Sequence, residues 1–196
     1  MTFACSSFFK ASCRTAAVAL LGLVFASSVW AADAPRVKFD TSLGSFTVEL
    51  NPEKAPKSVA NFLKYVEDKM YDNTVFHRVI AGFMAQGGGF TKDMQQKSTR
   101  SPIENESKNG LRNVAGSIAM ARTSDPNSAT SQFFINFVDN KMLDYPSPDG
   151  VGYAVFGKVI EGMDVVNKMA TIPTGMNDVP RQPIVVNSAR LMATEK

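Results

Sequence analysis

The sequence predicts a mainly β structure, closed or nearly closed, with two helices as caps. Three observations support this class. Apolar and polar residues alternate in many short segments, Gly, Asn and Ser interrupt those segments, and two stretches have helical spacing. Alternation is the pattern of a strand with one buried face, whereas repeats of three and four residues place one face of a helix inward.

A β-hairpin is expected first, followed by a helix. Residues 36–40 and 45–50 alternate, and residues 41–44 between them have the composition of a turn. Pro56 suits a first helical turn because its φ angle is fixed, and the apolar residues that follow it lie on one stripe. We therefore expect a helix over residues 56–68 that packs on a sheet.

The later segments are shorter and are separated by turn residues. Strands or strand fragments are expected over residues 74–80, 84–86, 116–121, 132–137, 153–160 and 184–192. A second, shorter helix is expected over residues 162–170. Residues 91–112 and 144–152 are polar loops rich in Gly and Pro, and loops on a rigid sheet often carry function.

The first 31 residues have the three-part pattern of a secretory signal peptide. Lys10 and Arg14 precede an uncharged apolar run of about 14 residues, which ends in small residues before cleavage after Ala31 or Ala32. The run is shorter than the roughly 20 residues that a membrane-spanning helix needs. We therefore expect cleavage, no membrane attachment afterwards, and a single domain over residues 32–196.

Cleavage would change the composition of the working protein. Both cysteines, Cys5 and Cys13, would leave with the signal, so disulfides, cysteine nucleophiles and thiolate metal sites are excluded. Two of the 21 basic residues would also leave, so 19 basic residues and 18 acidic residues would remain and the net charge would be close to zero. A nearly neutral domain lacks the basic patch expected of a nucleic-acid-binding protein.

Several kinds of catalytic site are excluded by what the chain lacks. His77 is the single histidine, so a histidine metal cluster cannot form. No Gly-x-Ser-x-Gly motif is present, and the glycines 87–89 are not followed by the Lys-Ser/Thr of a phosphate-binding loop. A hydrolase is therefore disfavoured, and we expect neither a metal nor a cofactor.

Residues 76–88 combine an arginine and a glutamine with apolar residues. If this segment is extended, Arg78 and Gln86 share parity with Met84 and can lie on one face with it. An arginine beside aromatic and methionine side chains suits an uncharged, proline-like ligand better than it suits a phosphate. His77 is interpreted as a hydrogen-bonded structural residue.

Three long motifs resemble those of the cyclophilin family, in the same order and with the same spacing. They are residues 76–88, residues 116–122 followed by 131–135, and residues 155–159 followed by Gly162-Met163. The resemblance extends from about residue 37 to residue 191. It implies a closed, eight-stranded antiparallel β-barrel capped by two helices, with the active site on the outer face of the barrel.

The resemblance also implies the activity of a peptidyl-prolyl cis-trans isomerase that needs no cofactor. Its partners would be proline-containing polypeptides that are unfolded or folding, and we expect a monomer. A rival interpretation is a non-catalytic, proline-binding chaperone module on the same fold. The presence of Arg78 favours the enzyme.

Residue roles follow from motif positions. Arg78 is implied to be the catalytic arginine. Gln86, Gln132 and the backbone near Ala121 and Arg122 are implied to bind the peptide main chain, with the Arg122 side chain solvated at the rim. The residues implied to line the proline pocket are Phe83, Met84, Phe133, Leu143 and Tyr153, and Met142 belongs either to this pocket or to the core. Phe133 is preferred to Phe134, because alternation sends only one of them to the site.

The sequence departs from the eukaryotic members in three places. Met142 stands where they carry Trp, Tyr153 stands where they carry His, and the loop over residues 144–152 is longer. The first change makes tight cyclosporin binding doubtful, and the second alters one wall of the pocket. Because secreted bacterial cyclophilins show similar departures, we expect a periplasmic protein.

Overall fold

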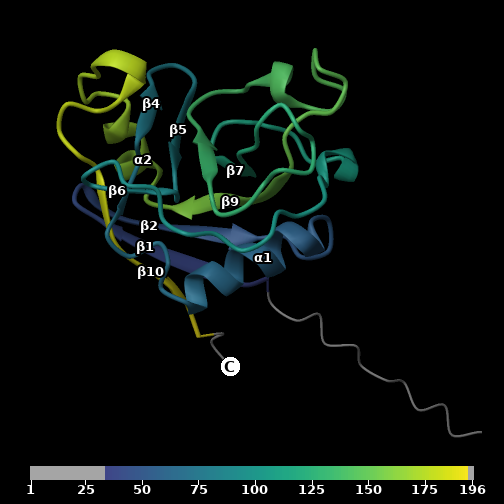
Figure 1. Ribbon diagram of the computed structural model, residues 1–196, viewed down its shortest axis with the longest axis horizontal. Coiled ribbons are helices and arrows are strands. Elements are labelled where there is room, and N and C mark those ends of the chain that lie inside the picture. Colours follow the sequence, from purple (N-terminus) through teal and green to yellow (C-terminus); the bar gives the residue numbers. More distant parts are fainter. Residues whose placement is uncertain (1–33, 194–196) are drawn as a thin grey trace, which may run out of the picture. The chain divides into compact units, whose positions relative to one another are not determined.

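The computed structural model describes residues 34–193 (Figure 1). The signal-peptide prediction for residues 1–31 lies outside these residues, as do both cysteines and Trp30. Within the described part of the chain, no helix is long and apolar enough to cross a membrane.

Ten strands form one antiparallel sheet. In the order of hydrogen-bonded neighbours, the sheet runs β4-β5-β8-β7-β9-β2-β1-β10-β3-β6. The bounds are β1 Arg36–Thr41, β2 Gly44–Leu50, β3 Thr74–Val75, β4 Arg78–Ile80, β5 Met84–Gly87, β6 Phe90–Thr91, β7 Ser117–Met120, β8 Phe133–Asn136, β9 Val155–Glu161 and β10 Val185–Leu191. The helices are α1 Pro56–Glu67 and α2 Met163–Met169, with short 3-10 turns η1 Ser107–Asn109, η2 Lys141–Leu143 and η3 Met176–Asp178.

The prediction of a mainly β fold with two helices is confirmed, but the sheet is curled and ten-stranded instead of a closed ring of eight strands. The expected strand over residues 74–80 is divided in two, and the two-residue strand β6 was not predicted. Phe76 and His77 separate β3 from β4, and two glycines separate β5 from β6. Gly88 has φ of 85°, and a Cβ there would lie 2.9 Å from the Phe133 ring, so the chain can turn there only with glycine. Strands β4 and β6 are therefore the two ends of the pairing order.

The main core is a cluster of aromatic rings around Phe133 of β8. The centroid of its ring lies 5.4 to 6.0 Å from those of four other aromatic rings, which belong to Phe39, Phe62, Tyr71 and Phe76. Phe133 is completely buried. A second, smaller apolar cluster contains Met84, Ala119, Phe134 and Val155. Because side chains alternate along β8, Phe133 belongs to the first cluster and Phe134 to the second.

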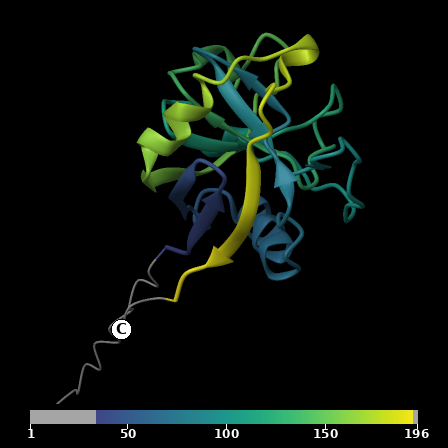
Figure 2. The ribbon, with the colours of Figure 1, turned by 90° about the vertical axis from the view of Figure 1, so that its left-hand side faces the viewer.

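The two helices cover different strands of the sheet. Helix α1 contacts β10, and α2 contacts β2. In Figure 2 the yellow strand β10 runs between α2, the yellow-green coil, and α1, the blue coil. The buried residues of α1 include Val59, Phe62 and Val66, which have the predicted helical spacing.

The first turn of α1 is capped by a residue far away in the sequence. Ala55, at the N-cap position, provides no side-chain acceptor. The carboxylate of Glu106 instead accepts hydrogen bonds from the backbone N–H groups of Lys57 and Ser58, at 2.9 and 2.8 Å, and from the Ser58 hydroxyl at 2.7 Å. A carboxylate at this position satisfies free N–H donors and interacts favourably with the helix dipole.

Replacing Glu106→Ala is expected to lower the free energy of unfolding by about 0.5–2 kcal/mol, the range observed for loss of an N-cap. Urea unfolding followed by circular dichroism measures the change. Glu104→Ala is the matched control, because Glu104 is exposed and its carboxylate is bonded, within residues 34–193, to the Lys57 ammonium alone. Equal stability of the Glu106→Ala variant and the wild type would contradict the capping role.

Candidate active site

A cavity of about 130 Å³ lies over the smaller apolar cluster. Its lining contains one strongly apolar side and two arginines. The residues that line it are Arg78, Phe83, Met84, Gln86, Ala121, Arg122, Phe134, Leu143 and Tyr153. Eight of these nine belong to the set implied by the motifs, so the fold brings most of that set together.

The register of three neighbouring strands explains why these side chains meet. Arg78 of β4 pairs with Gln86 of β5, and Gln86 pairs in turn with Phe134 of β8. Residues directly opposite each other in an antiparallel pair project to the same face. Arg78, Gln86 and Phe134 therefore form one row across the sheet.

The choice of Phe133 for the cavity wall was wrong, because this residue packs in the main core. Phe134 lines the cavity instead, and its ring makes an edge contact with Tyr153 at a centroid separation of 5.7 Å. Alternation alone separates the two phenylalanines without saying which faces the site. Phe134 pairs with Gln86, and Gln86 pairs with Arg78, so these three side chains lie on the same face of the sheet. This pairing identifies Phe134 as the phenylalanine that faces the site.

Two other predicted residues do not line the cavity. Met142 lies on η2 with 62% of its surface exposed, so it is neither core nor cavity wall. Gln132 contacts a residue of the cavity lining without lining the cavity itself. Its Oε1 accepts a hydrogen bond of 2.9 Å from Gln86 Nε2. That bond fixes the orientation of the Gln86 amide at the cavity.

Arg78 lies at the rim of the cavity and is held by a carboxylate from a distant loop. Its Nε donates to Oδ2 of Asp178 in η3 at 3.2 Å, and about two-fifths of each side chain is exposed. In Figure 1 the yellow segment with η3 lies beside β4. Within residues 34–193 no acceptor is bonded to the two Nη groups of Arg78. These N–H groups are free to donate to a ligand.

The backbone around Asp178 is strained. Asn177 and Asp178 have φ of 58° and 60°, in the left-handed region that non-glycine residues rarely adopt. Such conformations persist where the surrounding structure enforces them, and functional sites are common places for them. Asp178 was not predicted from the sequence, because a carboxylate 100 residues from its partner belongs to no local pattern.

Arg122 is not solvated at the rim as predicted, since its side chain is only 2% exposed. Its Nε donates to the carbonyl of Gly152 at 3.1 Å, Nη1 donates to that of Thr123 at 2.9 Å, and Nη2 binds Asp149. The guanidinium also lies over the Tyr153 ring, 4.4 Å from its centroid. Arg122 thus holds one cavity wall in place.

The partner of Arg122 is strongly acidic. Hydrogen bonds from Arg122 and from the Ser147 hydroxyl hold the pKa of the Asp149 carboxyl well below its usual range. Asp149 therefore stays ionised at neutral pH. Its charge balances the buried guanidinium of Arg122.

His77 is packed beside the site without contributing a charge. Burial is the main cause that lowers its pKa to about 4; a hydrogen bond with the Val75 backbone opposes this shift, the positive charge of Arg78 adds to it, and the imidazole is neutral near pH 7. Its ring packs on Phe90 at a centroid separation of 4.6 Å, and Nδ1 has no hydrogen-bond partner. A structural role agrees with this environment, although the hydrogen bond expected for the residue is missing at Nδ1.

No group of three or more His, Asp or Glu side chains within residues 34–193 is arranged to hold a metal ion. The groups that the cavity offers to a ligand are an apolar wall, the amide of Gln86 and the free N–H groups of Arg78. Such a site can bind a small uncharged ring and donate a hydrogen bond to it.

The chain is similar to several bacterial enzymes. Residues 36–191 match the family described as cyclophilin type peptidyl-prolyl cis-trans isomerase/CLD. The sequence is 56% identical over 162 residues to peptidyl-prolyl cis-trans isomerase cyp18 of Streptomyces antibioticus, covering 80% of this chain and 98% of that protein. It is 50% identical over 182 residues to peptidyl-prolyl cis-trans isomerase A of Dickeya dadantii, covering 90% and 95%. Isomerase B of Escherichia coli is 49% identical over 158 residues, covering 78% and 96%.

A solved structure supports the same relationship. A cyclophilin type peptidyl-prolyl cis-trans isomerase of Cryptosporidium parvum superposes with a TM-score of 0.70 at 26% identity, covering 83% of this chain and 99% of that one. Its structure in the presence of the dipeptide Ala-Pro gives a TM-score of 0.69 at 27% identity, covering 81% and 99%.

The neutral state of His77 predicts a pH dependence of stability. The folded-state pKa of about 4 lies below the ordinary value of 6.5, so the unfolded chain binds a proton first as pH falls. The contribution of the neutral imidazole is complete above pH 6.5 and is lost on the way to pH 4. Between pH 7 and pH 5 we expect the free energy of unfolding to fall by about 1–2 kcal/mol.

Urea unfolding at a series of pH values measures this slope, and His77→Gln is the control that cannot titrate. The variant should show a flatter dependence between pH 7 and pH 5, whatever its stability at pH 7. Parallel curves for the two proteins would refute the assignment, because His77 is the single histidine of the chain.

Proposed function

The chain belongs to the cyclophilin-type peptidyl-prolyl cis-trans isomerases, and we propose that Arg78 is the residue that lowers the barrier to rotation. The activity follows from the family match over residues 36–191 and from the close bacterial relatives. The observation that carries the proposed mechanism is the position of Arg78, with free Nη groups at the rim of a small apolar cavity.

The chemistry of the X-Pro bond explains why such a site would be effective. The planar bond resists rotation by roughly 18–20 kcal/mol because the nitrogen lone pair is shared with the carbonyl. Uncatalysed exchange therefore takes tens to hundreds of seconds. In the twisted transition state the sharing is lost, and the proline nitrogen becomes able to accept a hydrogen bond.

Arg78 suits the role of donor. A guanidinium is always charged and carries its donors in a rigid fork. Because Nε is bonded to Asp178, the Nη groups remain for the substrate. A hydrogen bond made only in the twisted state lowers the barrier without tightening ground-state binding. Such a charge-assisted bond is worth about 1.5–3 kcal/mol, or roughly ten- to a hundredfold in rate.

The cavity would supply the remaining acceleration. Phe83, Met84, Phe134 and Leu143 would grip the proline ring and exclude water. The twisted amide is less polar than the planar amide, so a dry site favours it. Tyr153, held under the guanidinium of Arg122 and in edge contact with Phe134, would extend this wall.

The peptide main chain would be held beside the ring. The Gln86 amide, oriented by Gln132, and the backbone of Ala121 and Arg122 are suited to bind it. Holding the flanking peptide restricts rotation to the one bond whose nitrogen faces Arg78. No nucleophile takes part, since no covalent bond is made or broken.

We propose that the clients are proline-containing polypeptides that fold in the periplasm. The signal-like pattern of residues 1–31 and the similarity to bacterial enzymes support this location. Cleavage after Ala31 or Ala32 would release a single isomerase domain, which we expect to act as a monomer. Met142 is not among the residues that line the cavity, and we expect no tight cyclosporin binding.

A non-catalytic chaperone module is the alternative use of the same cavity. Binding of proline segments needs the apolar wall but not a donor aimed at the nitrogen. The free Nη groups of Arg78 therefore favour catalysis over simple binding.

Replacing Arg78→Ala is expected to lower kcat/KM for an Ala-Pro peptide about ten- to a hundredfold, because the transition-state hydrogen bond is lost. NMR exchange spectroscopy measures the rate. Arg190→Ala is a closely matched control, since Arg190 is also about half exposed and paired with an aspartate, Asp72. An Arg78→Ala variant that retains full turnover while folded would mean that the donor lies elsewhere.

The two phenylalanines of β8 are expected to respond in opposite ways. Phe133→Ala removes a ring from the main core and should cost about 3–5 kcal/mol of stability. Phe134→Leu keeps an apolar side chain in the wall, so the fold should survive, while KM for the Ala-Pro peptide rises several-fold. Unfolding curves and exchange kinetics on both variants check this division. Greater loss of turnover at Phe133 than at Phe134, in folded protein, would reverse the assignment.

A further inference from the structure

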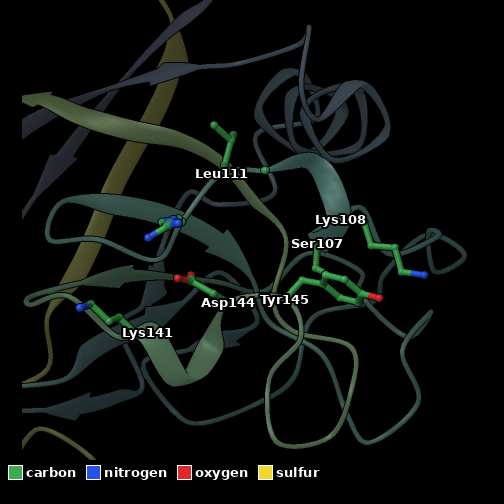
Figure 3. A pocket seen from close by; sticks show the side chains of 8 residues that line it. Ser107, Lys108, Leu111, Lys141, Asp144 and Tyr145 are labelled. Carbon is green, nitrogen blue, oxygen red and sulfur yellow. The ribbon is translucent and has the colours of Figure 1, made fainter.

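A second, larger cavity lies next to the one that contains Arg78. It has a volume of about 330 Å³ and is lined by Ser107, Lys108, Gly110, Leu111, Arg112, Lys141, Asp144 and Tyr145 (Figure 3). The two cavities share a dividing ridge formed by η2 and the residue after it. Leu143 lines the first cavity and Asp144 lines the second. Leu111 packs on the same apolar cluster as Leu143.

The two cavities differ in whether their basic side chains are paired with carboxylates. In the first, each arginine has an aspartate partner, Asp178 for Arg78 and Asp149 for Arg122. In the second, three basic side chains line the wall, and none of them forms an ion pair with any carboxylate of the described chain. These are Lys108, Arg112 and Lys141.

One carboxylate also lines the second cavity, and the protein already uses it. Oδ1 of Asp144 accepts hydrogen bonds from the backbone N–H and the Nδ2 of Asn113, at 2.6 and 3.1 Å. Figure 3 shows Asp144 between Lys141 on one side and Lys108 with Tyr145 on the other. The Lys108 ammonium lies over the Tyr145 ring, 5.1 Å from its centroid. Three cations against one carboxylate leave the wall with an excess of positive charge.

We propose that this second cavity is a basic subsite that binds an acidic side chain of the substrate, an Asp or Glu within a few residues of the proline. The proposal rests on the function proposed above, since it needs a proline ring seated in the first cavity. Charge is balanced where the uncharged ring would bind and is left unbalanced next to it. An extended peptide advances about 3.3–3.6 Å per residue, so residues beside the proline reach past the ridge.

The basic subsite gives the enzyme a preferred class of substrate. Proline segments that carry a nearby carboxylate would bind more tightly and associate faster, and salt would weaken the preference by screening. The rotation step itself would be unaffected, because Arg78 and the ring-binding residues are unchanged. The effect therefore belongs in affinity and KM, not in kcat.

The test uses two sets of hexapeptides with one Ala-Pro bond. One set places a single Glu one, two or three residues before or after the proline, and the other set has Gln at the same position. Affinity is measured by chemical-shift titration at low and at high salt, and turnover is measured by exchange spectroscopy. At low salt we expect at least one Glu peptide to bind about twofold to fivefold more tightly than its Gln twin, within the range typical of exposed ion pairs.

A charge-matched pair of variants locates the effect. Replacing Lys108→Gln, Arg112→Gln and Lys141→Gln together should abolish the Glu preference and leave the Gln peptides unchanged. The control replaces Lys38→Gln, Lys64→Gln and Lys92→Gln, three exposed lysines that line neither cavity, and it should retain the preference.

Three results would overturn the basic subsite: equal affinity for every Glu and Gln twin, a preference that survives the first triple variant, or one that the control variant also loses. Failure of the proposed function is a separate result. Wild type that binds the Gln peptides without speeding their exchange would refute the catalytic mechanism, whatever the ratio of affinities.

Discussion

The alternation of side chains along β8 is the constraint on which the site depends. Phe133 is fixed by contacts with four other rings of the main core, and its neighbour Phe134 is therefore forced to the opposite face of the sheet. A shift of one residue in register would exchange the two rings and remove the wall of the cavity. The position of the site is thus determined by the most tightly packed part of the fold.

The two arginines that line the cavity are held in different ways. The Arg122 side chain is buried, is hydrogen-bonded at all three of its nitrogens and supports Tyr153, whereas Arg78 is bonded only at Nε and keeps its outer donors. One arginine therefore supports a wall of the cavity, and the other keeps donors free for a ligand. The difference comes from the geometry of their aspartate partners, both of which are supplied by loops.

The sequence predicted the class of fold and most of the cavity lining, because long segments carry periodic patterns and the motifs of a family. It did not predict what loops supply. Asp178 and Asp149 lie in segments without periodicity, and their contacts with Arg78 and Arg122 arise only after the sheet has curled. Phe134 was missed for a different reason, since alternation identifies two faces without stating which one is the core. The break between β3 and β4 at His77 and the turn at Gly88 that leads into β6 depend on local packing that no sequence pattern reports.

The distant cap on α1 has a consequence for the order in which the chain folds. The first turn of the helix cannot gain its carboxylate acceptor until a residue 48 positions beyond Ser58 has docked against it. Closing so long a loop costs conformational entropy before any contact repays it, and contacts of this kind slow the search for the native state. During synthesis, residues 56–67 emerge well before Glu106. The helix must therefore first form without the carboxylate that caps its first turn. Glu106 therefore couples α1 to the segment around Lys108, and this segment is held in addition by hydrogen bonds to the carbonyls of Pro126, Val151, Gly152 and Val155.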